Sequence, residues 1–246
     1  MKAIILGGTR GMGRATARLL AEEGAELFLL GRNIEDLERS AQDLQQRSGG
    51  QRTIGTALCD LEQPDTFSDA LKTANEALGG VDTVIVTAGL FGSQLELEED
   101  LEFARRLLTV NFANTVIFCE HAKAHLLKNG GGSLVVFSSV AGDRGRKPVI
   151  LYGSSKAGLS AYLEGLDHKY RAEGLNTICI KPGFVRTGMT EGLTAPPFAG
   201  EPEGVARQVV QAIKKGTPVL YTPRMWGLVM LVIRNLPRFI MRKIGF

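Results

Sequence analysis

The chain contains little cysteine and histidine, with three residues of each among its 246. Cys59, Cys119 and Cys179 lie in apolar surroundings and lack the spacing of metal ligands, which favours buried thiols over a disulfide framework. A reducing cytoplasm is the simplest setting for such thiols. His121 and His125 have the i, i+4 spacing of a metal pair, but no third ligand accompanies them in the sequence. We therefore expect helix-surface histidines and no metal site.

Long hydrophobic runs are also missing. The apolar run Met225–Ile233 has nine residues, whereas a membrane-spanning helix needs about 20. The N-terminus carries one lysine and an apolar run that is too short for a signal peptide. No linker, repeat or low-complexity tract divides the chain, so we expect one domain over residues 1–221, with residues 222–246 as an extension of it.

The net charge is small, at +3, and its positive excess is local. Residues 222–246 contain Arg224, Arg234, Arg238, Arg242 and Lys243 and no acidic residue. One short basic segment is not the extended face that nucleic acid requires, so we expect no nucleic-acid partner. An apolar, basic segment could lie on an anionic membrane surface or present a groove to a lipid-linked substrate. Packing on the body or in a subunit interface is the other interpretation.

What the chain does contain is a regular alternation of strand-like and helix-like segments. We expect strands near residues 2–6, 25–30, 52–58, 81–87, 132–138, 175–180 and 218–221. Such alternation predicts an α/β fold of the doubly wound, Rossmann type: a three-layer sandwich whose central parallel sheet has about seven strands. Ligands of such folds bind at the carboxyl ends of the strands.

Two polar residues of one predicted helix, 152–172, suggest acid–base chemistry. Tyr152 and Lys156 stand one turn apart on the same face. A nearby ammonium favours phenolate, so we expect a lowered tyrosine pKa and a proton donor usable near neutral pH. The hydroxyl of Ser139 could hold a carbonyl oxygen while Tyr152 protonates it.

A glycine-rich turn opens the chain. It follows the apolar run Lys2–Leu6 and precedes a helical pattern, with glycines at positions 7, 11 and 13. Such glycines let the backbone approach a pyrophosphate at the N-terminus of the following helix. Three residues separate the first two glycines, which differs from the commoner GxGxxG spacing.

These motifs and their order resemble the short-chain dehydrogenase/reductase family in its single-domain form. They are the glycine turn, Asp60, Ala88-Gly89, Asn111, Ser139, Tyr152 with Lys156, and Pro182-Gly183-Phe184-Val185-Arg186-Thr187. The resemblance implies a catalytic tetrad of Asn111, Ser139, Tyr152 and Lys156, with Tyr152 as the acid/base. It also implies a small-molecule carbonyl substrate and a homodimer or homotetramer.

The same resemblance implies the residues that bind a nicotinamide cofactor. They are Gly7, Thr9, Arg10, Gly11, Met12, Gly13, Arg32, Asp60, Leu61, Ala88, Gly89, Tyr152, Lys156, Pro182, Gly183, Val185 and Thr187. Lys156 would hold the nicotinamide ribose, Asn111 would order a proton-relay water, and Thr187 would bind the carboxamide.

The chain departs from the family at two places. The family usually has Thr where Leu6 stands, and Asn-Asn-Ala-Gly where this chain has Val86-Thr87-Ala88-Gly89. The usual polar residues tie the glycine turn to the fourth strand. Their loss puts this structural hydrogen bond in doubt and leaves the chemistry intact.

Charge at the end of the second strand indicates which cofactor is used. NAD-preferring members of this fold carry an acidic residue there, but this chain reads Leu29-Leu30-Gly31-Arg32-Asn33. Arg32 and Arg10 could converge on a 2′-phosphate with charge-assisted hydrogen bonds. We therefore expect NADP(H). The alternative is that both arginines are solvated surface charges.

Two further segments bear on the substrate. Residues 188–200 are rich in turn formers and carry Met189, Leu193 and Phe198, as an apolar, mobile lid would. The segments 139–146, 152–159 and 234–243 are similar to reductases that act on a polyprenyl-phosphate-linked keto-pentose. By that resemblance, Arg144 and Arg146 flank the substrate entrance and could meet a phosphate; otherwise they are solvated loop charges.

Three functional classes compete on this sequence. The leading one is an NADP(H)-dependent carbonyl reductase or alcohol dehydrogenase, whose carbonyl compound could be a keto-sugar or a lipid-linked keto-sugar. A dinucleotide-binding sensor is the second, although such a protein needs no proton donor beside the nicotinamide. A membrane-surface interaction protein is the third, and only residues 222–246 favour it.

Overall fold

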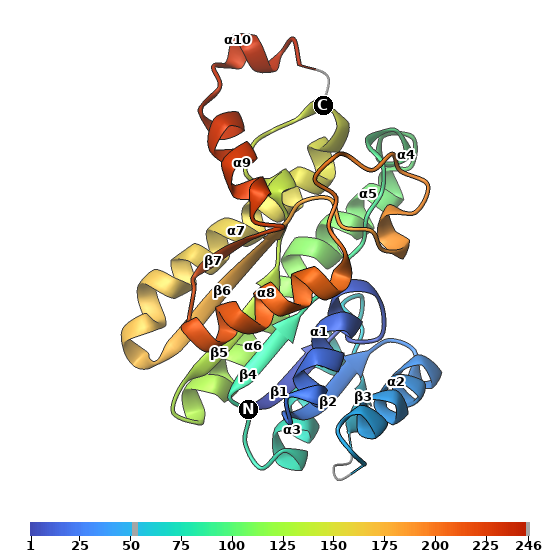
Figure 1. Cartoon of the computed structure of the whole chain (residues 1–246), viewed down its shortest axis with the longest axis vertical. Coiled ribbons are helices and arrows are strands. Elements are labelled where there is room, and N and C mark those ends of the chain that lie inside the picture. The colour runs from blue at the N-terminus through green and yellow to red at the C-terminus, as the bar shows by residue number, and fades with distance from the viewer. Residues whose placement is uncertain (51–53, 245–246) are drawn as a thin grey trace.

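A computed structural model of the chain describes residues 1–50 and 54–244 and contains a parallel β-sheet between two layers of helices (Figure 1). The strands are β1 (Lys2–Leu6), β2 (Glu26–Gly31), β3 (Gly55–Leu58), β4 (Thr83–Val86), β5 (Gly132–Phe137), β6 (Leu175–Pro182) and β7 (Val219–Thr222). Within the described residues these seven strands form one sheet in the order β3-β2-β1-β4-β5-β6-β7, and every neighbouring pair is parallel.

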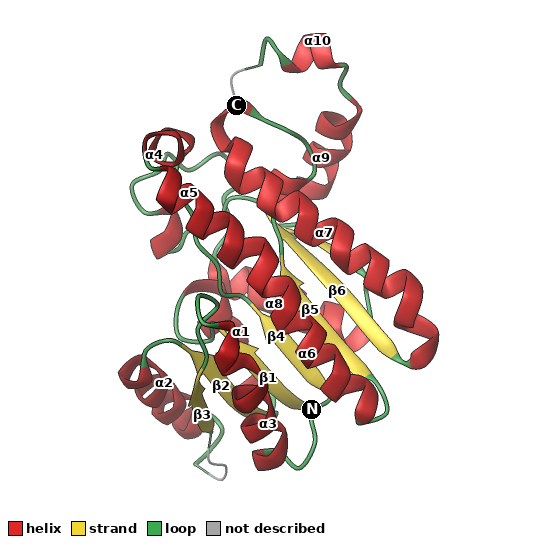
Figure 2. Ribbon diagram, turned by 180° about the vertical axis from the view of Figure 1, so that it is seen from behind, coloured by secondary structure: helices red, strands yellow, loops and turns green. Residues whose placement is uncertain are grey.

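Two cores fill the space between the sheet and its helices. Along β1, Ala3 and Ile5 enter one core while Ile4 and Leu6 enter the other, because successive side chains of a strand point to opposite faces. The first core receives α1 (Gly11–Glu22), α2 (Ile34–Arg47) and α8 (Pro202–Lys215), and the second receives α3 (Phe67–Ala77), α6 (Thr115–Lys128) and α7 (Ile150–Tyr170). Figure 1 faces α1 and α8, and Figure 2 faces α6 and α7. The predicted three-layer α/β sandwich is confirmed.

The predicted strands are correct in number and order but not in every boundary. β4 begins at residue 83 instead of 81, and β6 continues to Pro182 instead of ending at 180. Residues 52 and 53 of the predicted third strand lie outside the described residues. The helix predicted over 152–172 is α7, which begins two residues earlier and passes at its end into a 3₁₀ turn, Arg171–Glu173.

The remaining helices lie beyond the carboxyl ends of the strands. They are α4 (Gln94–Glu99), α5 (Leu101–Leu108), α9 (Met225–Asn235) and α10 (Arg238–Met241). Between α5 and α6 the chain forms a π-helical segment, Thr109–Asn114. α9 and α10 lie at one end of the molecule (Figure 1). No helix in the described part of the chain is long and apolar enough to cross a membrane.

The residues expected to be buried thiols and surface histidines can now be placed. Cys59, Cys119 and Cys179 are all buried free thiols, as predicted. His121 is exposed, and His125 is partly buried. Among residues 1–50 and 54–244, no three His, Cys, Asp or Glu side chains gather as a metal ion requires.

Candidate active site

The sequence motifs meet at the edge of the sheet where the strands end. The glycine turn follows β1, Ala88-Gly89 follows β4, and Ser139 lies two residues after β5. The strand order changes direction between β1 and β4, which lie side by side in the sheet. A crevice opens at such a switch point in doubly wound folds, and ligands bind there.

The glycine turn is packed so closely that side chains would not fit. Gly7 has a φ of +92°, and a Cβ added to it would lie 2.6 Å from Oγ1 of Thr87. A Cβ on Gly13 would lie 2.2 Å from the Gly7 carbonyl oxygen, and one on Gly11 would touch Thr187 at 3.4 Å. The turn leads into α1, whose first backbone N–H groups receive no side-chain cap from the described residues. Free donors and a helix dipole at a glycine turn suit a pyrophosphate.

Thr87 resolves the structural hydrogen bond that the sequence put in doubt. Its hydroxyl lies 3.1 Å from the Leu6 carbonyl oxygen and 2.9 Å from that of Gly7, and it donates to this pair of acceptors. The glycine turn is therefore tied to the end of β4 without the family's usual residues at Leu6 and Val86.

Asn111 lies in the π-helical segment and is fully buried. Its side chain is paired on both sides with the Leu90 backbone: Oδ1 accepts from the Leu90 N–H at 2.7 Å, and Nδ2 donates to the Leu90 carbonyl at 2.8 Å. A Cβ on Gly89 would lie 3.0 Å from Asn111 Oδ1 and 3.6 Å from Lys156 Nζ, so these three residues converge. Thr115 stabilises the π turn, since its hydroxyl donates to the carbonyl of Val110 at 2.7 Å.

Ser139 and Lys156 are buried at the centre of the site, and Tyr152 beside them is half-buried. Nζ of Lys156 donates to the Phe137 carbonyl at 3.0 Å and lies 5.9 Å from the centroid of the Tyr152 ring. Burial lowers the pKa of Lys156 to about 8. Burial also raises the pKa of Tyr152 to about 12, and a hydrogen bond with Ser139 acts in the opposite direction.

The pKa of Tyr152 corrects one expectation. The ammonium of Lys156 was expected to lower this pKa, but desolvation of the phenolate is the larger effect. The ring is enclosed on one side by Phe91, whose centroid lies 5.2 Å away. Tyr152 is consequently a neutral phenol near pH 7, which is the form that donates a proton.

Pro182, Gly183, Val185 and Thr187 continue from β6 along the crevice. Val185 is buried and bridges to Gly200, and the Thr187 N–H donates to Oγ1 of Thr190 at 3.0 Å. Gly183 is covered by the ring of Trp226, which a Cβ there would meet at 2.2 Å. Trp226 was not identified from the sequence, because nothing in a lone tryptophan of a distant segment indicates this contact.

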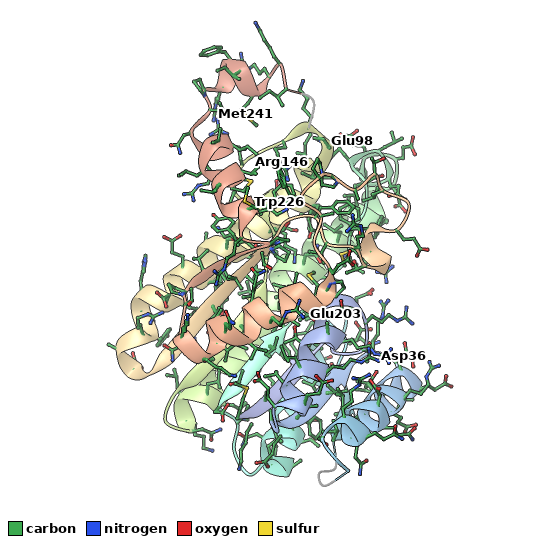
Figure 3. All side chains as sticks on the ribbon, viewed as in Figure 1. Asp36, Glu98, Arg146, Glu203, Trp226 and Met241 are labelled. Atoms are coloured by element: carbon green, nitrogen blue, oxygen red, sulfur yellow. The ribbon has the colours of Figure 1, made fainter. Side chains whose placement is uncertain are left out.

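The arginines expected at a 2′-phosphate follow the neighbouring strands β1 and β2, and each has an acidic partner. Arg10 donates to Asp36 at 2.8 Å, and Arg32 lies 3.8 Å from Glu62. The hydrogen bond from Arg10 holds the pKa of the Asp36 carboxyl below its usual range. Asp36, labelled in Figure 3, is a residue that the sequence analysis missed. The cap that Asn33 forms with the Asp36 N–H places this carboxylate in the first turn of α2, within reach of Arg10.

Asp60 and Leu61 lie after β3, as expected for a wall of the cofactor site. Oδ1 of Asp60 accepts from the Glu62 N–H at 3.0 Å. The Leu61 carbonyl accepts from Asn114 at 2.6 Å, which ties this loop to the π-helical segment beside Asn111. Thr9 and Met12 belong to the glycine turn and the first turn of α1.

Arg144 and Arg146 lie in a different place from the tetrad. They line a cavity of about 540 Å³ on the face of α7 that carries Gly153, Ser154 and Ala157. Helical spacing places these three residues on a different face from Tyr152 and Lys156. The cavity therefore lies on a different side of α7 from Tyr152 and Lys156, and the position of both arginines at the catalytic entrance stays a prediction.

Comparison with known proteins agrees with this architecture. The model of the short chain dehydrogenase family matches residues 1–197, and the chain belongs to that family. It is 34% identical over 242 residues to an uncharacterized oxidoreductase of Mycobacterium tuberculosis, covering 98% of this chain and 95% of that one. It is 29% identical to carbonyl reductase family member 4 of Danio rerio, covering 94% and 95%.

Solved structures show the same fold. A short-chain type dehydrogenase/reductase from Mycobacterium ulcerans superposes with a TM-score of 0.81 at 23% identity, over 89% of this chain and 87% of that one. Family membership makes the chain an oxidoreductase that uses a nicotinamide dinucleotide. The glycine turn fits that cofactor, because Gly7 and Gly13 allow a close approach of the backbone and no side chain of the described residues caps the first N–H groups of α1.

Proposed function

We propose that the chain catalyses NADP(H)-dependent interconversion of a carbonyl compound and a secondary alcohol. The observation that carries this proposal is the group of Ser139, Tyr152 and Lys156 beside Gly89 and Asn111, in which Tyr152 is half-buried and the other two tetrad side chains are buried. The nicotinamide, when bound, supplies or accepts the hydride. Gly7, Gly11 and Gly13 would hold its pyrophosphate, and Pro182–Thr187 its nicotinamide half.

Tyr152 would protonate the substrate oxygen during reduction. With a pKa of about 12 it is a neutral phenol at pH 7, and Ser139 would orient the carbonyl oxygen by a hydrogen bond. Lys156 would stabilise the phenolate left after transfer and bind the ribose. The neutral phenol is the form that donates a proton when a carbonyl group is reduced, and the phenolate is the form that accepts one in the reverse reaction.

Asn111 would act mainly by position. Both ends of its side chain are used by the Leu90 backbone, so it fixes residues 88–90 against Lys156. The amide keeps one further acceptor position and one further N–H, with which it would order the relay water that the resemblance assigns to Asn111.

The preference for NADP(H) rests on Arg10 and Arg32. Both guanidinium groups are largely exposed, at 83% and 62% of their side chains, and follow the two strands nearest the adenosine end of such sites. A 2′-phosphate would compete with Asp36 for Arg10 and with Glu62 for Arg32. Comparison of NADPH and NADH dissociation constants tests this preference.

For the substrate we propose a ketone, with a keto-sugar and its lipid-linked form as the specific candidates. Segment 188–200 would cover it through Met189, Leu193 and Phe198, whose side chains are 44%, 46% and 45% exposed. A sensor with little turnover is the less supported function, because the complete acid–base group has no purpose in it. Cytoplasmic location and a homodimer or homotetramer remain predictions.

The decisive experiment is NADPH oxidation against a panel of simple ketones, keto-sugars and lipid-linked keto-sugars. We expect turnover of at least one member and a large loss of it in Tyr152→Phe. Binding of NADPH without turnover of any panel member would favour the sensor.

A further inference from the structure

Helix α9 presents apolar side chains on its outward face. Its inward residues Met230 and Ile233 are 0% and 5% exposed, whereas Leu228, Leu231 and Val232 are 62%, 61% and 61% exposed. These three outward residues have the i, i+3, i+4 spacing of a single helix face. Phe239 of the neighbouring helix α10 is also apolar and is 65% exposed. A contiguous surface of this kind marks a site of interaction.

The charged side chains of the same segment are all basic. Arg224, Arg234, Arg238, Arg242 and Lys243 are exposed, and residues 222–246 contain no carboxylate to balance them. We call Leu228, Leu231, Val232, Phe239 and these five basic residues the C-terminal face. A binding partner that complements this face has an apolar region beside negatively charged groups.

Contacts with the body hold the C-terminal face in place. Arg144 donates to the Leu236 carbonyl at 2.8 Å, and Lys147 donates to the Arg242 carbonyl at 2.7 Å. At the base of α9, the Tyr221 hydroxyl donates to the buried carboxylate of Asp143 at 2.6 Å. The face is thus part of the folded structure, and its binding would require little further ordering of the chain.

The cavity on α7 opens beneath the C-terminal face. Met241 of the C-terminal segment and Arg146 of the loop after β5 both line it (Figure 3). Its basic lining residues are Arg144, Arg146, Lys147, Arg238 and Arg242. Val149, Ile150 and Ile244 add an apolar lining. Cations beside apolar side chains match a phosphate group joined to an acyl chain.

We propose that the C-terminal face docks this protein onto the surface of a bilayer containing anionic phospholipids. Leu228, Leu231, Val232 and Phe239 enter the interface, while the basic residues and the cavity meet headgroup phosphates. Apolar burial and attraction to anionic lipid add together in such docking. This function is independent of the reductase activity and goes beyond it.

Charge favours a bilayer over a second copy of the chain as the occupant. In a two-fold dimer the same patch faces itself, so the five cations of one copy would meet those of the other. An anionic lipid surface instead neutralises them.

Sedimentation of the full-length protein with phosphatidylcholine vesicles, with and without phosphatidylglycerol, tests the proposal. We expect binding only to the anionic vesicles, weakened by salt. The variant Leu228→Gln/Leu231→Gln/Val232→Gln should bind far less, and Arg234→Gln/Arg238→Gln should bind roughly 30-fold less, at about a fivefold loss per charge. The matched control Leu95→Gln/Leu101→Gln changes residues on α4 and α5 that are 64% and 73% exposed, and it should bind like the parent.

Several outcomes would overturn the proposal. Absence of binding by the intact protein to anionic vesicles is one, and equal losses in the control and the α9 variant are another. Self-association that depends on Leu228, Leu231 and Val232, measured by sedimentation velocity, would show that the face joins two copies. Unchanged thermal unfolding and NADPH binding of each variant establish that the fold is intact.

Discussion

Helices α8 and α9 lie close together in the sequence and use their apolar residues in opposite ways. In α8, Val205, Val209 and Ile213 are buried against the sheet, and its polar residues face outward. In α9, more large apolar side chains face outward than inward. The sheet alone explains the sequence of α8, whereas the outward apolar residues of α9 are left uncovered by the described part of the chain and are the basis of the proposed docking. The family model matches residues 1–197, which contain the sheet and the proposed active site. Features that distinguish this protein from other members of the family are expected in the residues that follow.

The largest expected effect is a loss of turnover in a variant of the proposed active site. It tests whether catalysis can be removed without changing the C-terminal face. Tyr152→Phe should lower kcat by about 10²–10⁴-fold, because it removes only the transferable proton. NADPH affinity and vesicle binding should not change. Tyr162→Phe is the matched control: this tyrosine also lies on α7, but its hydroxyl donates to Glu120 at 2.7 Å, away from the site. Undiminished turnover in Tyr152→Phe would refute the mechanism.

The second prediction tests how firmly the two regions are joined. Asp143 is buried, lies 2.6 Å from Lys181 on β6 and accepts from Tyr221 on β7. Asp143→Ala leaves the Lys181 charge without its partner and should lower the free energy of unfolding by about 3–5 kcal/mol. Tyr221→Phe keeps the ion pair and should cost about 1.5–3 kcal/mol. Urea unfolding measures the free energy of unfolding of both variants. Equal small losses would mean that the Asp143 contacts with Lys181 and Tyr221 contribute little to stability.

The contacts of α9 with the rest of the chain decide how the C-terminal segment should be studied. Truncation after Pro223 would remove Met230 and Ile233 from their contact with Val140 and would leave apolar surface on the body exposed. Substitutions on the outward face separate docking from folding more cleanly than a truncation does.

The third prediction concerns cofactor charge. Arg10→Ala/Arg32→Ala should weaken NADPH binding by up to about 30-fold, because each exposed charge pair contributes about 1 kcal/mol or less. Asp36→Asn should strengthen it a few-fold by freeing Arg10. NADH binding should be unaffected in both variants. Arg18→Ala, which removes an arginine paired with Asp43, is the control. Equal losses for both cofactors would show that Arg10 and Arg32 do not recognise the 2′-phosphate.

The last prediction is a pH dependence of stability. Burial lowers the pKa of Lys156 from 10.5 to about 8, so between these values the unfolded chain binds more protons than the folded one. The free energy of unfolding then gains a contribution that rises with pH across this window. Lys156→Met should be stabilised relative to the parent at pH 7, and the advantage should shrink toward pH 10.5. A constant difference in the free energy of unfolding between Lys156→Met and the parent across this pH range would contradict the lowered pKa of Lys156.

The sequence predicts most of the body because its signals are local. Apolar runs such as Lys2–Leu6 and the closely spaced glycines of the first turn can be recognised from their neighbours in the sequence, without knowledge of distant residues. The π-helical segment at Asn111 was not predicted, since it depends on one hydroxyl of Thr115 bonding to Val110. The pKa of Tyr152 was expected to fall because sequence spacing reveals a neighbouring charge but not the extent of burial. Asp36 was missed for the same reason, as its contact with Arg10 crosses 26 residues.

Trp226 is the one tryptophan of the chain and lies where residues 188–200, the segment after β6 and α9 meet. Its ring covers Gly183, and its Nε1 donates to the Phe198 carbonyl at 3.2 Å. Emission from a single indole has one origin, so the native protein already carries a fluorescent probe at this junction. Cofactor entry, movement of residues 188–200 and docking of the C-terminal face can each be followed by its intensity and wavelength, without any label.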